Sequence, residues 1–331
     1  MQSQTLDDRL TTVVTLDVER DSENVRLMHL HGGRRLAYTE YGDRNGYPLF
    51  HCHSHGSSRL EAASFHKAAL AGGFRIIAID RPGVGLSDYC AYSSVEGFAT
   101  VLLALADKLR CKQFGLLANG GGASYALAVA ELEPTRIGIV LGLSCQFPHQ
   151  SRTGVLLRKS AGIAIKLSIY FRHFVASHTP SRYLQHILDN LSFADKRLFE
   201  NPKLLAMVER DMKESLRQGV KGLAQDSALQ LKVQPLKFER LQMPCHFWQG
   251  SSDCRRALHV AQRFVSQCPE GKLHELANRG RFFYLRNVED VFANANLALG
   301  RTQSSVPANT VSLTKPCANK AFVAQAKTAN R

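Results

Sequence analysis

The chain has 331 residues, of which 44% are hydrophobic, enough to build the core of one large α/β domain with an insertion. Two independent domains are possible but not required. The start, MQSQTLDDRLTTVV, lacks the apolar stretch of a signal peptide, and the best candidate for a membrane span, 154–171, is interrupted by Arg158, Lys159 and Lys166. We therefore expect a cytoplasmic protein. Its net charge of +14 favours anionic partners.

The first half of the chain alternates apolar strand patterns with helical patterns. The expected strands are 24–30, 34–42, 48–54, 74–80, 114–119 and 136–144. The expected helices are 59–70, 95–109 and 123–132, and glycine-rich turns separate them from the strands.

The second half begins with a helical, basic stretch over 146–241 that contains no obvious strand. The strand pattern resumes at 245–253 and 272–280, with helices expected over 257–267 and from about Phe282. Strands that alternate with helices in this way predict right-handed βαβ units and a parallel sheet with buried strands. After Gly300 the chain is polar, which is typical of disorder.

Polar and glycine-rich motifs follow four of the expected strands. Because function in a parallel sheet lies at the carboxyl ends of its strands, we expect these motifs to meet. The four motifs are His53-Ser54-His55-Gly56-Ser57-Ser58-Arg59, DRPGVGLSD at 80–88, NGGGASYALA at 119–128, and Gly250-Ser251-Ser252-Asp253.

These motifs occur in an order that resembles the α/β-hydrolase superfamily, over about Asn24 to Leu297. The 80–88 loop and the RQGxxGxxxD stretch at 217–226 resemble a bacterial branch of small-substrate hydrolases. The resemblance implies a mostly parallel sheet flanked by helices, with a helical lid. The implied organisation is an arm at 1–23, a core at 24–145 and 242–299, a lid at 146–241 and a disordered basic tail at 300–331.

The resemblance also implies where a catalytic triad would lie. The family places its nucleophile in a G-x-S-x-G turn between a strand and a helix, and aligning that turn puts Gly120 at the nucleophile position. Asp253 takes the position of the acid, and Arg281 takes that of the histidine. Glycine has no nucleophilic side chain, and arginine cannot accept a proton at neutral pH.

A misalignment is the alternative to this degenerate triad. Ser124 would then be the displaced nucleophile, but it falls inside the expected helix, where its hydroxyl would face the packing. His274 is the nearest later histidine, but it falls inside the last expected strand.

The backbone groups of the family's oxyanion hole do not depend on the lost side chains. They correspond to the N–H of Gly121 and to one near Ser57, after the turn at His55-Gly56. We expect Asp253 to pair with Arg281, and a small anion to bind between Gly121 and Arg281.

Three histidines form an H-x-H-x-H run at 51, 53 and 55, which on a strand would share one face and could suit a metal. The role of His55 in the turn is the simpler interpretation, and we expect neither a metal nor a cofactor. The eight cysteines lack CxxC spacing and are expected to be reduced and mostly buried.

The basic charge is concentrated in two stretches without acidic residues, 134–188 and 291–331. They could bind nucleic acid or an anionic membrane, although a solvated basic face is the simpler explanation because no nucleic-acid motif accompanies it. The apolar and basic lid could touch a membrane, but we expect it to pack on its own domain.

Three functional hypotheses follow. The favoured one is a hydrolase-like protein without serine-hydrolase activity that binds a small molecule or anion in the former active-site pocket. It would have a regulatory or accessory role, and a protein partner is an open alternative. The second is an enzyme that acts on a small ester or acyl substrate through a non-standard site. The third is a binder of anionic surfaces.

Overall fold

The structure is a computed structural model, and the residues that it describes are 24–30, 32–92, 94–147, 170, 171, 174, 178–231, 237–286 and 288–301. The expected arm at 1–23, nearly all of the tail and most of the acid-free stretch before residue 178 lie outside these residues. Of the helices in the described ranges, none combines the length and hydropathy that crossing a bilayer requires.

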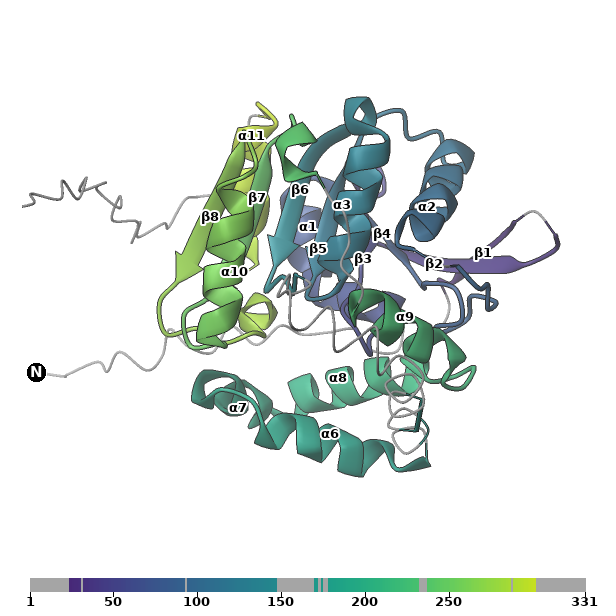
Figure 1. Cartoon of the computed structure of the whole chain (residues 1–331), viewed down its shortest axis with the longest axis vertical. Helices are drawn as coiled ribbons and strands as arrows, with labels where there is room; N and C mark the ends of the chain where they lie inside the picture. The colour runs from purple at the N-terminus through teal and green to yellow at the C-terminus, as the bar shows by residue number, and fades with distance from the viewer. Residues whose placement is uncertain are drawn as a thin grey trace, which may run out of the picture.

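A single sheet of eight strands organises the molecule, in the order β1-β2-β4-β3-β5-β6-β7-β8 (Figure 1). The strands β1 and β2 form the antiparallel edge, and all pairs from β4 to β8 are parallel. The strands are Arg26–His29, Arg35–Gly42, Tyr47–Cys52, Phe74–Ile79, Phe114–Asn119, Ile137–Leu143, Cys245–Gly250 and Gly271–Leu276 for β1 to β8. The predicted, mostly parallel α/β sheet is therefore confirmed.

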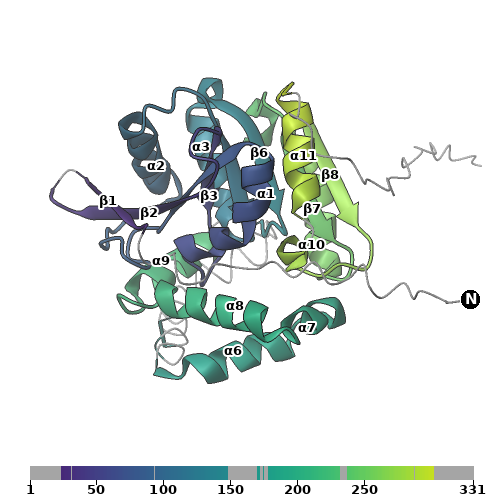
Figure 2. The same ribbon diagram turned by 180° about the vertical axis from the view of Figure 1, so that it is seen from behind.

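Helices cover both faces of this sheet. Figure 1 shows α2 (Glu96–Lys108), α3 (Gly122–Leu132) and α10 (Arg255–Val265) over one face. Figure 2, turned by 180°, shows α1 (His66–Ala71) and α11 (Glu289–Ala298) over the other. Central strands buried on both faces explain the continuous apolar runs in the sequence.

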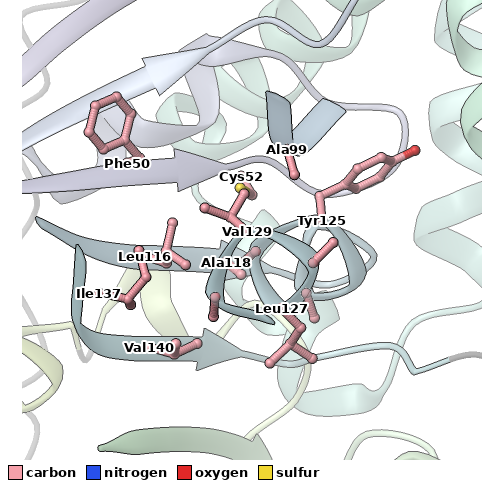
Figure 3. Packing of buried hydrophobic residues seen from close by; sticks show 14 of the residues in the cluster. Phe50, Cys52, Ala99, Leu116, Ala118, Tyr125, Leu127, Val129, Ile137 and Val140 are labelled. Atoms are coloured by element: carbon pink, nitrogen blue, oxygen red, sulfur yellow. The ribbon is translucent and has the colours of Figure 1, made fainter. Parts of the chain in front are cut away.

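The larger core cluster lies between the central strands and the helices α2 and α3 (Figure 3). Phe50 on β3 and Phe114 on β5 are fully buried, with ring centroids 4.8 Å apart at an angle of 66°. Tyr125 on α3 is also fully buried and packs edge-on against Phe98 of α2. These large rings hold α3, and with it the turn from β5, at a defined place above the sheet.

Two of the predicted helices begin differently in the structure. Arg59–Phe65 is a 3₁₀-helix, and the α-helix begins only at His66. The last helix, expected from about Phe282, begins at Glu289 after a short 3₁₀-turn. The backbone N–H groups of Arg281 and Phe282 both donate to Asp195, so this segment is tied to the helical region rather than to a helix of its own.

Four described helices stand between β6 and β7, where the sequence predicts a strand-free insertion. They are α6 (Pro180–Asp189), α7 (Phe193–Phe199), α8 (Pro202–Ser215) and α9 (Lys221–Leu231). Both views show them beyond one end of the sheet, at the tips of the strand arrows (Figures 1 and 2). We refer to these four helices as the helical insertion.

A buried ion pair joins the helical insertion to the core. Arg81, which follows β4, is fully buried, and its Nε and Nη2 donate to Asp226 of α9 at 2.8 and 2.5 Å. The Tyr125 hydroxyl donates to the other oxygen of Asp226 at 2.7 Å. Arg81 also donates to the carbonyl oxygens of His53 and Ser54, at 2.6 and 3.1 Å.

This contact explains why the sequence carries both the 80–88 loop and the 217–226 stretch. The Gln218 amide donates to the carbonyl oxygens of Gly85 and Ser87, each at 2.8 Å. Gly222 lies so close to Gly83 that a methyl group at residue 222 would overlap the Gly83 carbonyl oxygen. The two motifs are therefore the two halves of one interface.

We expect Asp226→Ala to lower the free energy of unfolding by about 3–5 kcal/mol, because it leaves the buried Arg81 charge without its carboxylate. Urea unfolding of the variant and the wild type measures this difference. As a control, Asp107→Ala breaks the exposed pair with Arg136 and should cost at most about 1 kcal/mol. A loss below about 1 kcal/mol for Asp226→Ala would contradict the structural role of the pair.

Candidate functional site

A pocket of about 250 Å³ lies where the carboxyl ends of the strands meet the helical insertion. The core contributes residues at or after the ends of β3, β5 and β6 and the segment 281–285 that follows β8, and the insertion contributes residues of α6 and α8. The sequence-predicted site residues that line the pocket are His55, Gly56, Ser57, Gly120, Gly121 and Arg281. Asp253 is not part of the lining.

Gly120 occupies the sharp turn from β5 into α3. Its φ of +49° is in the left-handed region, which a strand-to-helix turn of this kind requires. Its N–H donates to the Leu143 carbonyl at 2.9 Å, and its own carbonyl accepts from the Gln146 N–H at 3.0 Å. Both bonds fix the turn against the end of β6, while residue 120 presents no side chain to the pocket.

Two further residues of this segment lie in tight packing. Gly122 approaches β3 so closely that a methyl group there would overlap the Cys52 carbonyl oxygen. Ser124, the alternative nucleophile, is 1% exposed inside α3, and its hydroxyl has no hydrogen-bond partner among the described residues. It faces the packing, as predicted, and not the pocket.

Arg281 and Asp253 form the expected ion pair at the edge of the site. The Nη2 of Arg281 lies 3.4 Å from an Asp253 oxygen, and the other Asp253 oxygen accepts from Gln249 at 3.0 Å. The Arg281 side chain is 39% exposed, so the pair is partly screened by water. The Ser144 hydroxyl donates to the Arg281 carbonyl at 2.7 Å and holds this residue against the end of β6.

The three histidines of the H-x-H-x-H run do not share one face, because β3 ends at Cys52. His51 Nε2 lies 3.2 Å from Glu61, whereas His55 Nε2 lies 2.9 Å from the Ser227 hydroxyl. His53 is fully buried, and burial together with the nearby Arg81 charge lowers its pKa well below the usual range. Within the described residues, no group of three or more His, Cys, Asp or Glu side chains could hold a metal ion.

Two buried carboxyl groups in the pocket wall were missed by the sequence analysis. Glu61 accepts from the Ser54 N–H at 3.0 Å and from the Ser54 hydroxyl at 2.5 Å. Asp211 of α8 accepts from the hydroxyl of Ser57 and from the N–H and hydroxyl of Ser58, the last two at 2.9 and 2.5 Å. The two acids therefore hold opposite ends of the loop at 54–58.

Their surroundings shift the two pKa values in opposite directions. Burial, and next the charge of Glu61, raise the pKa of Asp211 to about 8, against the hydrogen bonds from Ser57 and Ser58. Burial also opposes ionisation of Glu61, but the hydrogen bond and charge of His51 and the bonds from Ser54 outweigh it, so the Glu61 pKa is lowered. At neutral pH Glu61 is the anion and Asp211 holds a proton.

We expect the stability of the wild type to fall as pH rises from about 4 to about 8, through Asp211. In this window the unfolded Asp211 has lost a proton that the folded state still binds, so each step in pH favours unfolding. The Asp211→Asn side chain cannot ionise, so the free energy of unfolding of this variant should lack this part of the pH dependence. Relative to the wild type, its free energy of unfolding should rise by at least about 1 kcal/mol between pH 5 and pH 8. Urea unfolding across that range measures it.

The exposed Asp290 on α11 offers a matched control, since Asp290→Asn should keep the pH slope of the wild type. Equal slopes for Asp211→Asn and the wild type would show that Asp211 ionises as an ordinary carboxyl group.

Comparison with known proteins agrees with this architecture. A model of the alpha/beta hydrolase family matches residues 31–294. Among solved structures, the enol-lactonase from Burkholderia xenovorans LB400 aligns with a TM-score of 0.66 and 16% identity, over 83% of this chain and all of that one. A thermophilic esterase from Thermogutta terrifontis, solved with malate bound, aligns with a TM-score of 0.65 and 16% identity, over 83% and 98% of the two chains.

Curated relatives match a shorter part of the chain. The dihydrolipoyllysine-residue acetyltransferase component of the acetoin cleaving system of Pseudomonas putida is 35% identical over 107 residues, 32% of this chain and 29% of that protein. A 2-hydroxy-6-oxononadienedioate/2-hydroxy-6-oxononatrienedioate hydrolase of the same organism is 29% identical over 133 residues, which is 38% of this chain and 46% of that protein. The chain spans less than half the length of these relatives. The family model, however, covers well over half of this chain and agrees with its fold, so the chain belongs to the alpha/beta hydrolase family.

Proposed function

We propose that this chain binds a small acyl compound or small organic anion in the pocket, and that it lacks the serine-hydrolase activity that would need a nucleophile at residue 120. Its role would then be that of a binding, regulatory or accessory protein built on the hydrolase fold. The observation that carries the proposal is the turn at Gly120, which has the backbone conformation expected of a nucleophile turn and no side chain.

The position predicted for the histidine supports the same proposal. Arg281 lies in the pocket wall and pairs with Asp253, so a permanent cation occupies the place where a general base would be needed. Among the described residues, Ser124 and His274 supply no substitute, since Ser124 is packed inside α3 and His274 lies within β8, stacked on Trp248.

Size and polarity suggest the kind of ligand. A volume of about 250 Å³ is below the about 300–1,000 Å³ that is usual for drug-sized ligands, so a small molecule is favoured. The first N–H groups of α3, at Gly121 and Gly122, and the Arg281 cation would attract an oxygen that carries negative charge. The ionised Glu61 on the same pocket wall would repel a second anionic group.

The second candidate is an enzyme that acts on a small ester or acyl substrate through a non-standard site. The observation in its favour is the Ser54 hydroxyl, which lies in the pocket wall and donates to the buried Glu61 carboxylate. A panel of p-nitrophenyl esters, tested on the wild-type chain, distinguishes turnover from binding alone.

We expect the double variant Gly120→Ser with Arg281→His to hydrolyse p-nitrophenyl acetate at least about tenfold faster than the wild type or either single variant. The double variant restores a nucleophile and a base to positions that Asp253 and the α3 N–H groups already serve, and triad members act together. Initial rates of p-nitrophenol release measure the effect.

The control is Asp253→Asn in the double-variant background, which should remove most of the gain because the new imidazole loses its orienting carboxylate. If the double variant were no faster than the single ones, the assignment of residue 120 as the nucleophile position would be wrong.

A further inference from the structure

Ser54 lies beside the space that a side chain at residue 120 would occupy. A Cβ atom built on Gly120 would be 3.2 Å from the Ser54 Cβ and 3.9 Å from its Cα, and it would meet no other described atom within 4 Å. Both residues line the same pocket, and Ser54 is half-buried there. A hydroxyl-bearing side chain is therefore the immediate neighbour of the empty nucleophile position.

The Ser54 hydroxyl has a carboxylate as its hydrogen-bond acceptor. It donates to Glu61 Oε1 at 2.5 Å, while the Ser54 N–H donates to Oε2 at 3.0 Å, so the two residues are held in one orientation. The Glu61 side chain is only 6% exposed, and its Oε2 lies 3.2 Å from Nε2 of the fully buried His51. The short, charge-assisted hydrogen bond from Ser54 to the buried Glu61 carboxylate places a proton acceptor next to the serine oxygen.

The same pocket supplies the two other groups that acyl transfer needs. The N–H groups at the start of α3 can stabilise an oxyanion that forms near Gly121. Asp211 lines the pocket from α8, and because its pKa is raised it holds a proton at neutral pH that a leaving group could take.

We propose that Ser54 is a displaced nucleophile, with Glu61 as its base and Asp211 as the acid, and that it accepts the acyl group of a small ester. The Ser54 oxygen forms a bond to the acyl carbon as its proton passes to Glu61. The bond from the acyl carbon to the ester oxygen breaks, and the departing alcohol takes the proton of Asp211. Water then adds its hydroxyl to the acyl carbon and gives its other proton to Asp211. The bond from the acyl carbon to the Ser54 oxygen breaks, and Glu61 returns a proton to that oxygen, so the serine and both acids are regenerated.

This inference rests on the proposed function in one respect, that the ligand occupies this pocket. It specifies the second candidate function as a covalent step at residue 54, which the absence of a side chain at residue 120 does not exclude, and it would make the chain an enzyme as well as a binding protein. If the contacts of Glu61 served only to hold the 54–58 loop, the hydroxyl would remain unreactive, and a chemical probe separates these two cases.

The experiment treats the full-length wild-type chain with a fluorophosphonate probe and maps the modified residue by proteolysis and mass spectrometry. Attack by Ser54 forms an oxygen–phosphorus bond and releases fluoride, so the expected result is a phosphonyl adduct on Ser54. Ser54→Ala should abolish the adduct, and Glu61→Gln should slow its formation at least about tenfold. Ser266→Ala, which changes an exposed serine at the C-terminal end of α10, outside the pocket lining, should react like the wild type.

Absence of an adduct on the wild-type chain, an adduct on another serine, or equal rates for Glu61→Gln and the wild type would each overturn the proposal. Thermal unfolding shows whether each variant is folded. If a variant is not, the site of modification on the wild-type chain still tests the proposal. Titration with acetate, followed by protection of the pocket in hydrogen exchange, tests the pocket separately. Protection without an adduct would refute only the Ser54 step, and an adduct without protection would refute only the anion as ligand.

Discussion

Arg81 and Asp226 form an ion pair without access to water, and both walls of the pocket depend on it. On one side, Asp226 anchors α9 and with it the helical insertion. On the other side, the same guanidinium donates to the carbonyl oxygens of His53 and Ser54 and so positions the loop that follows β3. A charge buried in this way is tolerated only when each of its donors finds an acceptor. Tyr125 completes the arrangement, since it donates to Asp226 and lies beneath Arg81, 4.7 Å from the guanidinium carbon to the ring centre.

The chemistry available in the pocket follows from what this framework places there. The turn at Gly120 has a left-handed backbone and no side chain, and the Arg281 cation lies in the pocket wall beside Asp253. Under the proposed function, these two residues stand at the positions of the nucleophile and the base. Glu61 and Asp211 are both buried, but their pKa values shift in opposite directions. His51 and Ser54 lower the pKa of Glu61 against the effect of burial, whereas burial and the charge of Glu61 raise that of Asp211. Ligand binding and a serine reaction at residue 54 are thus separate properties of one cavity, and either could exist without the other.

Much of the fold could be predicted from the sequence because the buried strands leave a strong local signal. The central strands appear as continuous apolar runs. Of the four motifs at strand ends, those at 53–59 and 119–128 line one pocket, and the 80–88 loop contacts the first of them through Arg81, whereas the motif at 250–253 does not line the pocket. The pairing of Asp253 with Arg281 was also predictable, since a carboxylate without its usual partner needs another counter-charge. The start of the last helix could not be predicted, because Asp195, which is far away in the sequence, binds the backbone N–H groups of Arg281 and Phe282 before it.

The pocket carboxyl groups escaped the sequence analysis for the same reason. Asp211 lies in an amphipathic helix in which an acid is usually solvated, and only its contacts with Ser57 and Ser58 reveal that it is buried. Glu61 was expected inside an ordinary helix, whereas the 3₁₀-helix of the structure places it beside Ser54. Spacing along the chain carries no information about such contacts between distant segments.

The close approach of Gly83 and Gly222 has a consequence for how chains of this type can diverge. A β-carbon on Gly222 would overlap the Gly83 carbonyl oxygen, and a β-carbon on Gly83 would lie 2.8 Å from the Tyr89 ring and 3.0 Å from the Gly222 Cα. An alanine at residue 222 would push α9 away from the 80–88 loop and stretch the Arg81–Asp226 pair, and one at residue 83 would also have to adopt the left-handed φ of +81°. Substitutions at these two sites should therefore be tolerated only together with a rearrangement of both segments. We therefore expect residues 83 and 222 to change only together with the Arg81–Asp226 pair. The other residues of the insertion helices are not bound by this constraint.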